Sequence, residues 1–408
     1  MEHSLHMLLA GLILGVVLVV FTLGKSPLFR VDRAGAALIG AVAMIGTGVL
    51  SPDKTAAAVD YKTIIILFSM MIVVANLKLA GFFEFVGNHL LQVVSSKKSL
   101  LFAIIWVSGC LSAFVINDIV CLLFTPIVLL LCQETDCNPV PNLLGVAMAS
   151  NIGSAATLLG NPQNILVGSL SGMSFLSYFK TAVPVTILGL FCTFIVIAFY
   201  YRKDLQGNLK KNRQIPGNIH MYLIIKSTLI LAVILTAYLL GYDLALVASL
   251  GAAVSLMTRR VKPNKVYASV DFNLLIIFIG LFIIVAGVEE SGLITYIFDQ
   301  LSFSKVNDLG VFAIVTVGLS NLVSNVPAVL LIRFLMPDTG IELWWKALAL
   351  FSTFAGNLTI AGSVANLIVV EIARRNHVYP TARDYFRIGF PLTLVVTFIG
   401  YLWLTLFL

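Results

Sequence analysis

Charged side chains are scarce in this sequence. Asp, Glu, Lys and Arg make up 11% of its 408 residues, whereas a soluble domain carries about 25%. So few charges cannot cover the surface of a water-soluble fold, and 59% of the residues are apolar, with a mean hydropathy of +1.01. This composition excludes a soluble globular protein and predicts a chain whose main solvent is the lipid bilayer.

The motifs of soluble catalytic and metal sites are also missing. There is no Walker loop, HExxH or GxSxG, so we expect no enzyme activity, no cofactor and no ATP hydrolysis by this chain. The five cysteines include no CxxC pair, and we expect neither a metal site nor a structural disulfide. The net charge of +7 comes from basic residues clustered between apolar segments, and it therefore does not indicate a nucleic acid partner.

Apolar segments recur along the whole chain, many of them near the roughly 20 residues that cross a bilayer as a helix. Two further stretches have a polar break at mid-length, at Ile116-Asn117-Asp118 and at Ser324-Asn325-Val326-Pro327. Their halves look too short to cross, which predicts re-entrant hairpins that enter and leave on one side. We predict an all-α polytopic membrane protein with ten transmembrane helices and two re-entrant hairpins. The predicted spans are 5–24, 33–50, 61–80, 141–171, 182–201, 219–240, 243–258, 270–288, 343–374 and 386–407, and the hairpins are 99–133 and 306–336.

Basic residues indicate which side of the membrane each loop faces, because short cytoplasmic loops are enriched in Lys and Arg. Placing the loop around Arg202–Arg213 inside puts most of the 26 Lys and Arg inside as well, including the loop Lys25–Arg33. Both termini then lie outside the membrane, on the periplasmic or extracellular face.

Short motifs of the first half recur in the second half in the same order. Val59-Asp60-Tyr61 matches Val270-Asp271-Phe272, and Asn117 matches Asn325. In the predicted topology the matched spans run in opposite directions, and such inverted repeats are typical of secondary transporters. The sequence therefore predicts a first repeat over 1–201, a cytoplasmic linker over 202–218 and a second repeat over 219–408, with the substrate site where the repeats meet.

Two predicted spans, 141–171 and 343–374, contain a further polar break rich in Gly, Asn, Ser and Thr. Non-helical backbone at mid-depth persists only beside a cavity or inside protein, so we expect these two broken helices and both hairpin tips to meet at one midplane site. The alternative is that the polar residues only join helices to one another. The predicted substrate-binding residues are Ser112, Asn117, Asn151, Gly153, Ser154, Thr157, Gly160, Asn161, Asn164, Ser324, Asn325, Asn357, Thr359, Gly362, Ser363 and Asn366.

Asp118 is an acid at the tip of the first hairpin, surrounded by apolar sequence, and its counterpart in the second repeat is Val326. An ionisable group at such depth is costly and is by default a functional candidate. We interpret Asp118 as a proton carrier that couples transport to a proton gradient. The alternative is that its carboxylate caps the second half of the hairpin.

Several of these motifs resemble those of bacterial arsenite permeases. The resemblance rests on Asn117-Asp118 followed by Thr125-Pro126-Ile127, on Ser324-Asn325-Val326-Pro327, and on Asn357–Asn366 followed by Tyr385-Phe386-Arg387. It covers nearly the whole chain. Sodium-coupled members of the wider ion transporter superfamily carry Ser-Asn-Thr at the hairpin tips, and this chain departs from that pattern at both tips.

The resemblance implies export of arsenite or antimonite, as neutral trihydroxides, across the inner membrane in exchange for protons, bound by hydroxyls and amides rather than by a fixed arginine. It also implies a possible homodimer and a cytoplasmic ATPase subunit as partners. Thiols could hold arsenic(III) as well, and Cys110 and Cys121 flank the first tip. The alternatives left open are a sodium/proton antiporter or an anion transporter of the same superfamily, and a passive channel for a neutral solute.

Overall fold

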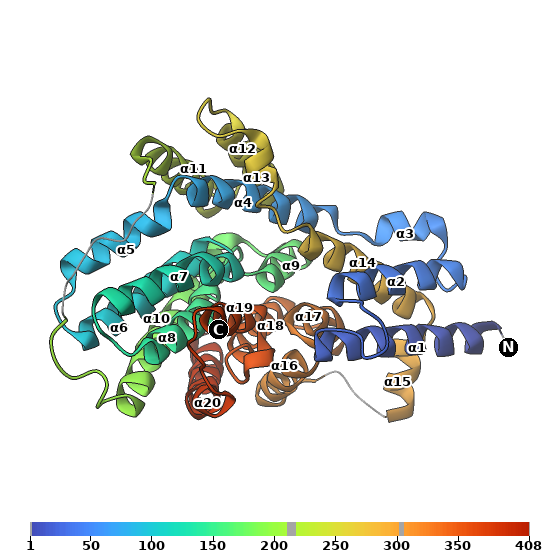
Figure 1. Cartoon of the computed structure of the whole chain (residues 1–408). Helices are drawn as coiled ribbons and strands as arrows, with labels where there is room; N and C mark the ends of the chain where they lie inside the picture. The colour runs from blue at the N-terminus through green and yellow to red at the C-terminus, as the bar shows by residue number, and fades with distance from the viewer. Residues whose placement is uncertain (1, 210–217, 302–305, 408) are drawn as a thin grey trace.

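The computed structural model of the chain describes residues 2–209, 218–301 and 306–407 (Figure 1). These residues form helices and contain no β-strand, which confirms the predicted all-α class. Part of the predicted linker 202–218 lies outside them. Eight of the described helices are long and apolar enough to cross a membrane: α1 (Glu2–Leu23), α4 (Tyr61–Leu79), α6 (Lys97–Phe114), α7 (Asn117–Glu134), α10 (Phe175–Tyr200), α11 (Met221–Leu239), α14 (Phe272–Glu290) and α20 (Ala382–Phe407). Shorter apolar helices are α2 (Arg33–Gly46), α12 (Leu244–Leu256), α16 (Leu309–Val323) and α17 (Asn325–Ile332), which continues into the 3₁₀ turn η1 (Arg333–Leu335).

The two spans predicted to contain a polar break each consist of two helices. A side chain caps the second helix of each pair: Asn161 accepts a hydrogen bond from the N–H of Asn164, and Ser363 accepts one from the N–H of Ala365. Such caps replace the missing partners of a helix start, so the breaks are built into the sequence. The helices are α8 (Pro139–Ser154) and α9 (Pro162–Ser171) in the first pair, and α18 (Ile341–Ala355) and α19 (Val364–Arg375), with η2 (Ile360–Gly362) between them, in the second.

The first hairpin corrects one expectation. Its helices, α6 and α7, have 18 residues each and are both long enough to cross a membrane. The prediction that each half is too short is wrong here, because the helices continue through charged ends at Lys97 and Glu134 that the apolar pattern leaves out. In the second hairpin α17 has only 8 residues, in keeping with a short re-entrant half.

Four short helices were not predicted, because they are too short or too amphipathic to stand out as apolar runs. Local signals mark two of them: Ser51 caps the first ahead of Pro52, and Pro263 begins another, both common helix starts. They are α3 (Pro52–Ala58), α5 (Phe82–Val93), α13 (Pro263–Tyr267) and α15 (Leu293–Leu301).

The order of elements in the first half recurs in the second, with α1–α10 followed by a matching α11–α20. The packing is reciprocal: α2 packs on α14 while α4 packs on α12, and α1 packs on α14 while α11 packs on α4. Matched aspartates also cap matched helices, Asp32 and Asp243 at α2 and α12, Asp60 and Asp271 at α4 and α14. Two copies of one unit related by a two-fold axis would give these pairs; their opposite orientation across a membrane stays a prediction.

The helices pack as two groups. The framework group contains α1, α2, α4, α11, α12 and α14, and the hairpin group contains α6–α10 and α16–α20. Figure 1 shows α4, α11 and α12 along one edge of the molecule and α1, α2 and α14 at one end, around the hairpin group.

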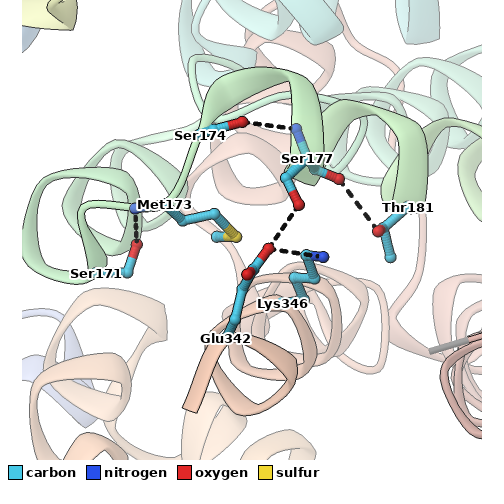
Figure 2. A network of polar contacts seen from close by, with 7 residues as sticks. All are labelled: Ser171, Met173, Ser174, Ser177, Thr181, Glu342 and Lys346. Atoms are coloured by element: carbon cyan, nitrogen blue, oxygen red, sulfur yellow. Dashed lines mark hydrogen bonds and ion pairs between the residues drawn. The ribbon is translucent and has the colours of Figure 1, made fainter. Parts of the chain in front are cut away.

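A polar cluster joins the starts of α10 and α18 within the hairpin group. Glu342 accepts hydrogen bonds from Ser177 Oγ at 2.5 Å and from the buried Lys346 Nζ at 2.9 Å (Figure 2). Ser174 caps α10 one turn before Ser177. The cluster therefore fixes α18, which leads into the break at its far end, against α10.

Candidate functional site

Both hairpin tips and the starts of α9 and α19 meet at one cavity of about 60 Å³, called here the central cavity. The hairpin group supplies its polar wall, and α1, α2 and α14 of the framework group close it. A cavity of this size holds only a few water molecules, so a solute bound in it must be small. Its lining residues are Phe21, Arg33, Asn117, Asp118, Pro162, Gln163, Leu274, Ile277, Ser324, Asn325, Val326, Pro327, Ser363 and Val364.

Asn151 in α8 is the centre of the hydrogen-bond network behind this cavity. Its Nδ2 donates to Oδ1 of Asn357 and of Asn366, both at 2.9 Å. Its Oδ1 accepts from Nδ2 of Asn117 at 3.1 Å and from Oγ of Ser363 at 3.0 Å. One side chain thus joins the first hairpin tip to both ends of the break between α18 and α19.

The hydrogen bonds at the two broken helices repeat at the same spacing in both halves of the chain. In each, the asparagine in the first turn after the break donates to two backbone carbonyls of the break, and its Oδ1 accepts from a side chain of the other half, Thr353 for Asn164 and Asn151 for Asn366. The carbonyls are those of Ser154 and Thr157 in the first half and of Gly356 and Thr359 in the second.

Asn117 and Asn325, which occupy matching places in the two hairpin tips, each have a buried Oδ1 without a hydrogen-bond partner. Both side chains line the central cavity. The Asn151 network fixes the orientation of the Asn117 amide, because its Nδ2 already donates to Asn151. Leaving a buried acceptor unpaired costs free energy, so these two oxygens suit a ligand that brings hydroxyl donors or a positive charge.

Asp118 does not cap its own helix, since α7 starts after Ile116 with no side-chain cap. Asp118 lines the central cavity together with Ser363 and Val364 at the start of α19, where the helix dipole favours a negative charge. The acid therefore links the first hairpin tip to the second broken helix, at the wall of the cavity.

Arg33, the first residue of the predicted span 33–50, is a cavity residue that was not among the predicted site residues. It is the first residue of α2, lines the central cavity together with Asp118, and its Nε donates to the carbonyl of Phe21 at 3.0 Å. The charge count uses Arg33 only to orient the segment Lys25–Arg33, whereas Asp32 caps the helix that Arg33 begins and the Arg33 side chain lines the cavity. The Asp32-Arg33 helix start was the available signal.

Ser324, at the second hairpin tip, has a backbone φ of +74° and ψ of 157°. Residues other than glycine rarely adopt this conformation, and it costs on the order of 1–3 kcal/mol. Such strain persists where the surroundings hold it, and Ser324 lines the cavity.

The other predicted residues form the walls behind the cavity rather than its lining. Thr157 donates to the carbonyl of Ala113, and Ser112 to Ser150; a Cβ at Gly153 would lie 2.2 Å from the backbone of Gly109, so these elements pack backbone against backbone. The predicted wall residues are Ser112, Gly153, Ser154, Thr157, Gly160, Asn161, Asn164, Thr359 and Gly362. The network residues that the prediction missed are Ser150, Gln163, Asn321 and Thr353. Among the described residues no group of three His, Cys, Asp or Glu could hold a metal ion.

A polar cavity at helix breaks, buried among apolar membrane-length helices, is the arrangement of a membrane transporter, and the comparisons with known proteins agree. The family model described as citrate transporter (CitMHS) matches residues 16–355. The chain belongs to this transporter family.

Individual relatives extend over almost the whole chain. The "Silicon efflux transporter LSI3" of Oryza sativa subsp. japonica is 30% identical, over 92% of each chain. The "Putative transporter arsB" of Dictyostelium discoideum is 26% identical, over 91% of this chain and 86% of that protein. Among solved structures, the YdaH transporter of Alcanivorax borkumensis has a similar fold, with a TM-score of 0.59 at 15% identity over 98% of this chain and 97% of that one.

Proposed function

We propose that this transporter exports arsenite and antimonite, as their neutral trihydroxides, in exchange for protons. The observation that carries the proposal is the pair of unpartnered amide oxygens of Asn117 and Asn325, which line one small cavity beside Asp118. A trihydroxide brings three hydroxyl donors and no charge, so it can pair with both acceptors without the desolvation cost of an ion.

The size of the cavity also supports a small solute. The central cavity, about 60 Å³ in the state that the structure describes, favours a small solute over a tricarboxylate, which needs several charged partners as well. The names of two relatives, one for silicon efflux and one arsB, point to the same chemistry, because silicic acid is also a small neutral hydroxide. Silicic acid is therefore the second candidate substrate.

Asp118 carries the coupling proton in this proposal. A proton would enter on the Asp118 carboxyl as the trihydroxide leaves. Only the proton would then carry charge across the membrane, because the trihydroxide is neutral. The hairpin group would move past the framework group, exposing the cavity to either side in turn. Both termini would lie outside the membrane; a homodimer and a cytoplasmic ATPase subunit stay predictions.

The test is arsenite uptake into everted membrane vesicles under an imposed proton gradient. Wild-type vesicles should accumulate arsenite, a protonophore should abolish the accumulation, and Asp118→Asn should reduce it at least tenfold. Glu371→Gln, which alters a carboxylate paired with Arg375 at 3.0 Å in α19, is the matched control and should transport normally.

Each alternative gives a different result. A passive channel would equilibrate arsenite without accumulating it, and a sodium-coupled carrier would respond to a sodium gradient instead. Transport that survives Asp118→Asn would remove the proton role. Accumulation of germanic acid, a tracer for silicic acid, in vesicles that do not accumulate arsenite would mean that the substrate is silicic acid rather than arsenite.

A further inference from the structure

A second cavity, of about 480 Å³, lies at the far ends of two helices that begin at the central cavity. α7 begins with Asn117 and α19 with Val364, which line the central cavity, while Gln133 near the end of α7 and Asn376 after α19 line the second one. The two cavities thus have no lining residue in common and lie at opposite ends of the same two helices.

The second cavity lies on the side of the linker. Asn138, in the turn between α7 and α8, donates from Nδ2 to Oδ1 of Asp204 at 3.2 Å. Asp204 belongs to the basic segment that the charge distribution assigns to the cytoplasm. In the predicted topology, the second cavity therefore faces the compartment from which an exporter takes its substrate.

Cys132 and Cys137 both line this cavity, and the end of α7 brings them together. The N–H of Cys137 donates to the carbonyl of Cys132 at 2.9 Å, the N–H of Asp136 donates to that of Gln133 at 3.4 Å, and Asp136 has a positive φ of 54°. These are the two bonds and the left-handed residue of a Schellman motif, whose side chains at the positions of Cys132 and Cys137 commonly contact each other. The turn thus presents two thiols as neighbours.

Hydrogen bonds orient both sulfur atoms, and the Cys137 thiol itself donates to the carbonyl of Thr135 at 3.6 Å. Asn142 Nδ2 donates to Cys132 Sγ at 3.4 Å, and Thr135 Oγ1 donates to Cys137 Sγ at 3.3 Å. Both cysteines are free. The Oδ1 of the same Asn142 is buried and has no hydrogen-bond partner.

We propose that Cys132 and Cys137 form a dithiol site for trivalent arsenic or antimony on the cytoplasmic side. Thiols are soft ligands, and a trivalent metalloid bound by two sulfurs can keep one hydroxyl as its third ligand. Two As–O bonds of the trihydroxide break and two As–S bonds form, and each thiol proton leaves with a hydroxide as water. Arsenic stays trivalent, and hydrolysis by two waters reverses the step.

The role of the site as a place of capture before export rests on the proposed function, whereas the binding itself does not. With two sulfurs rather than three, the adduct keeps an exchangeable oxygen ligand and can be released. Neither Cys110, which is exposed, nor Cys121, which is buried in α7, lines this cavity.

Binding can be measured on the purified full chain with phenylarsine oxide, which bonds to two thiols and loses its oxygen as water. Intact mass spectrometry should find one equivalent on the wild type, removable by an added dithiol, with two cysteines protected from maleimide. The control Cys192→Ser, in α10, should bind equally. Cys132→Ser and Cys137→Ser should each weaken binding at least tenfold.

Cys137→Ser keeps the test valid if Cys132→Ser does not fold, because Cys137 is only partly buried. Absence of binding to the wild type, or undiminished binding to a folded Cys137→Ser, would overturn the site. In the vesicle assay, Cys137→Ser should raise the arsenite concentration at half-maximal rate about fivefold and leave the maximal rate unchanged. Binding without any arsenite transport would instead overturn the proposed function and leave the dithiol site standing.

Discussion

Among the described side chains that line the central cavity, Asp118 and Arg33 carry the charge. They belong to different helix groups, so their attraction joins the groups in the state that the structure describes. We expect Arg33→Gln to lower the transport rate by about tenfold or more, since 1.4 kcal/mol of lost stabilisation suffices for that factor. Arg33→Lys should retain part of the activity, because it keeps the charge but loses the Nε bond to Phe21.

The matched control is Arg30→Gln, which removes an exposed charge three residues earlier in the chain. The measurement is the vesicle transport rate of the three variants, normalised to the amount of protein in the membrane, and it shows whether Arg33 takes part in transport. If Arg33→Gln transports like Arg30→Gln, the arginine only supports the loop and has no part in the cycle.

Two substitutions of Ser324, at the other hairpin tip, distinguish the effect of backbone strain on stability from the effect of the hydroxyl on transport. Ser324→Gly relieves the positive φ and should raise the free energy of unfolding by about 1 kcal/mol, while it removes a hydroxyl from the cavity. Ser324→Ala removes the same hydroxyl but keeps the strain. We expect both variants to transport slowly and only the glycine variant to melt at a higher temperature in detergent; equal melting temperatures would argue against strain.

At the scale of elements, the cluster of Ser177, Glu342 and Lys346 holds α10 against α18. Lys346 has a side chain only 7% exposed, so Glu342→Gln leaves a buried ammonium without its anion. Because Glu342 itself is 56% exposed, we expect a modest loss of about 1 kcal/mol at pH 7. The double variant Glu342→Gln/Lys346→Met should recover most of this loss in thermal unfolding.

The same cluster predicts a pH dependence. Hydrogen bonds from Ser177 and then from Lys346 lower the pKa of Glu342 below its ordinary value of 4.5. A depressed pKa means that the stabilisation is present above the ordinary value and is lost as the pH falls through the folded value. The melting temperatures of wild type and Glu342→Gln should therefore differ at neutral pH and converge in acid; a constant difference would contradict this assignment.

The helices and their breaks could be predicted from the sequence, whereas the contacts between them could not. Composition and apolar length located the apolar helices but not their lengths, since α6 and α7 are both long enough to cross a membrane while α2 and α12 have only 14 and 13 residues. Polar residues in apolar surroundings located all four breaks, because non-helical backbone at membrane depth must find polar partners. The Asn151 network could not be derived, since it joins residues of both halves that only packing brings together. Arg33 was missed as a site residue for a similar reason, since only the fold brings it to the same cavity as Asp118.

At the scale of the whole molecule, the matching halves leave one decisive question, which is whether they cross the membrane in opposite directions. Asp53 in α3 and Asn264 in α13 occupy equivalent exposed places in the two halves. With the five native cysteines replaced, Asp53→Cys should react with a membrane-impermeant maleimide on intact cells, and Asn264→Cys only after permeabilisation. Lys203→Cys, in the predicted cytoplasmic linker, is the inside control. Labelling of Asp53→Cys and Asn264→Cys from the same side would mean parallel repeats, and alternating access could then not arise from exchanging the conformations of two inverted halves.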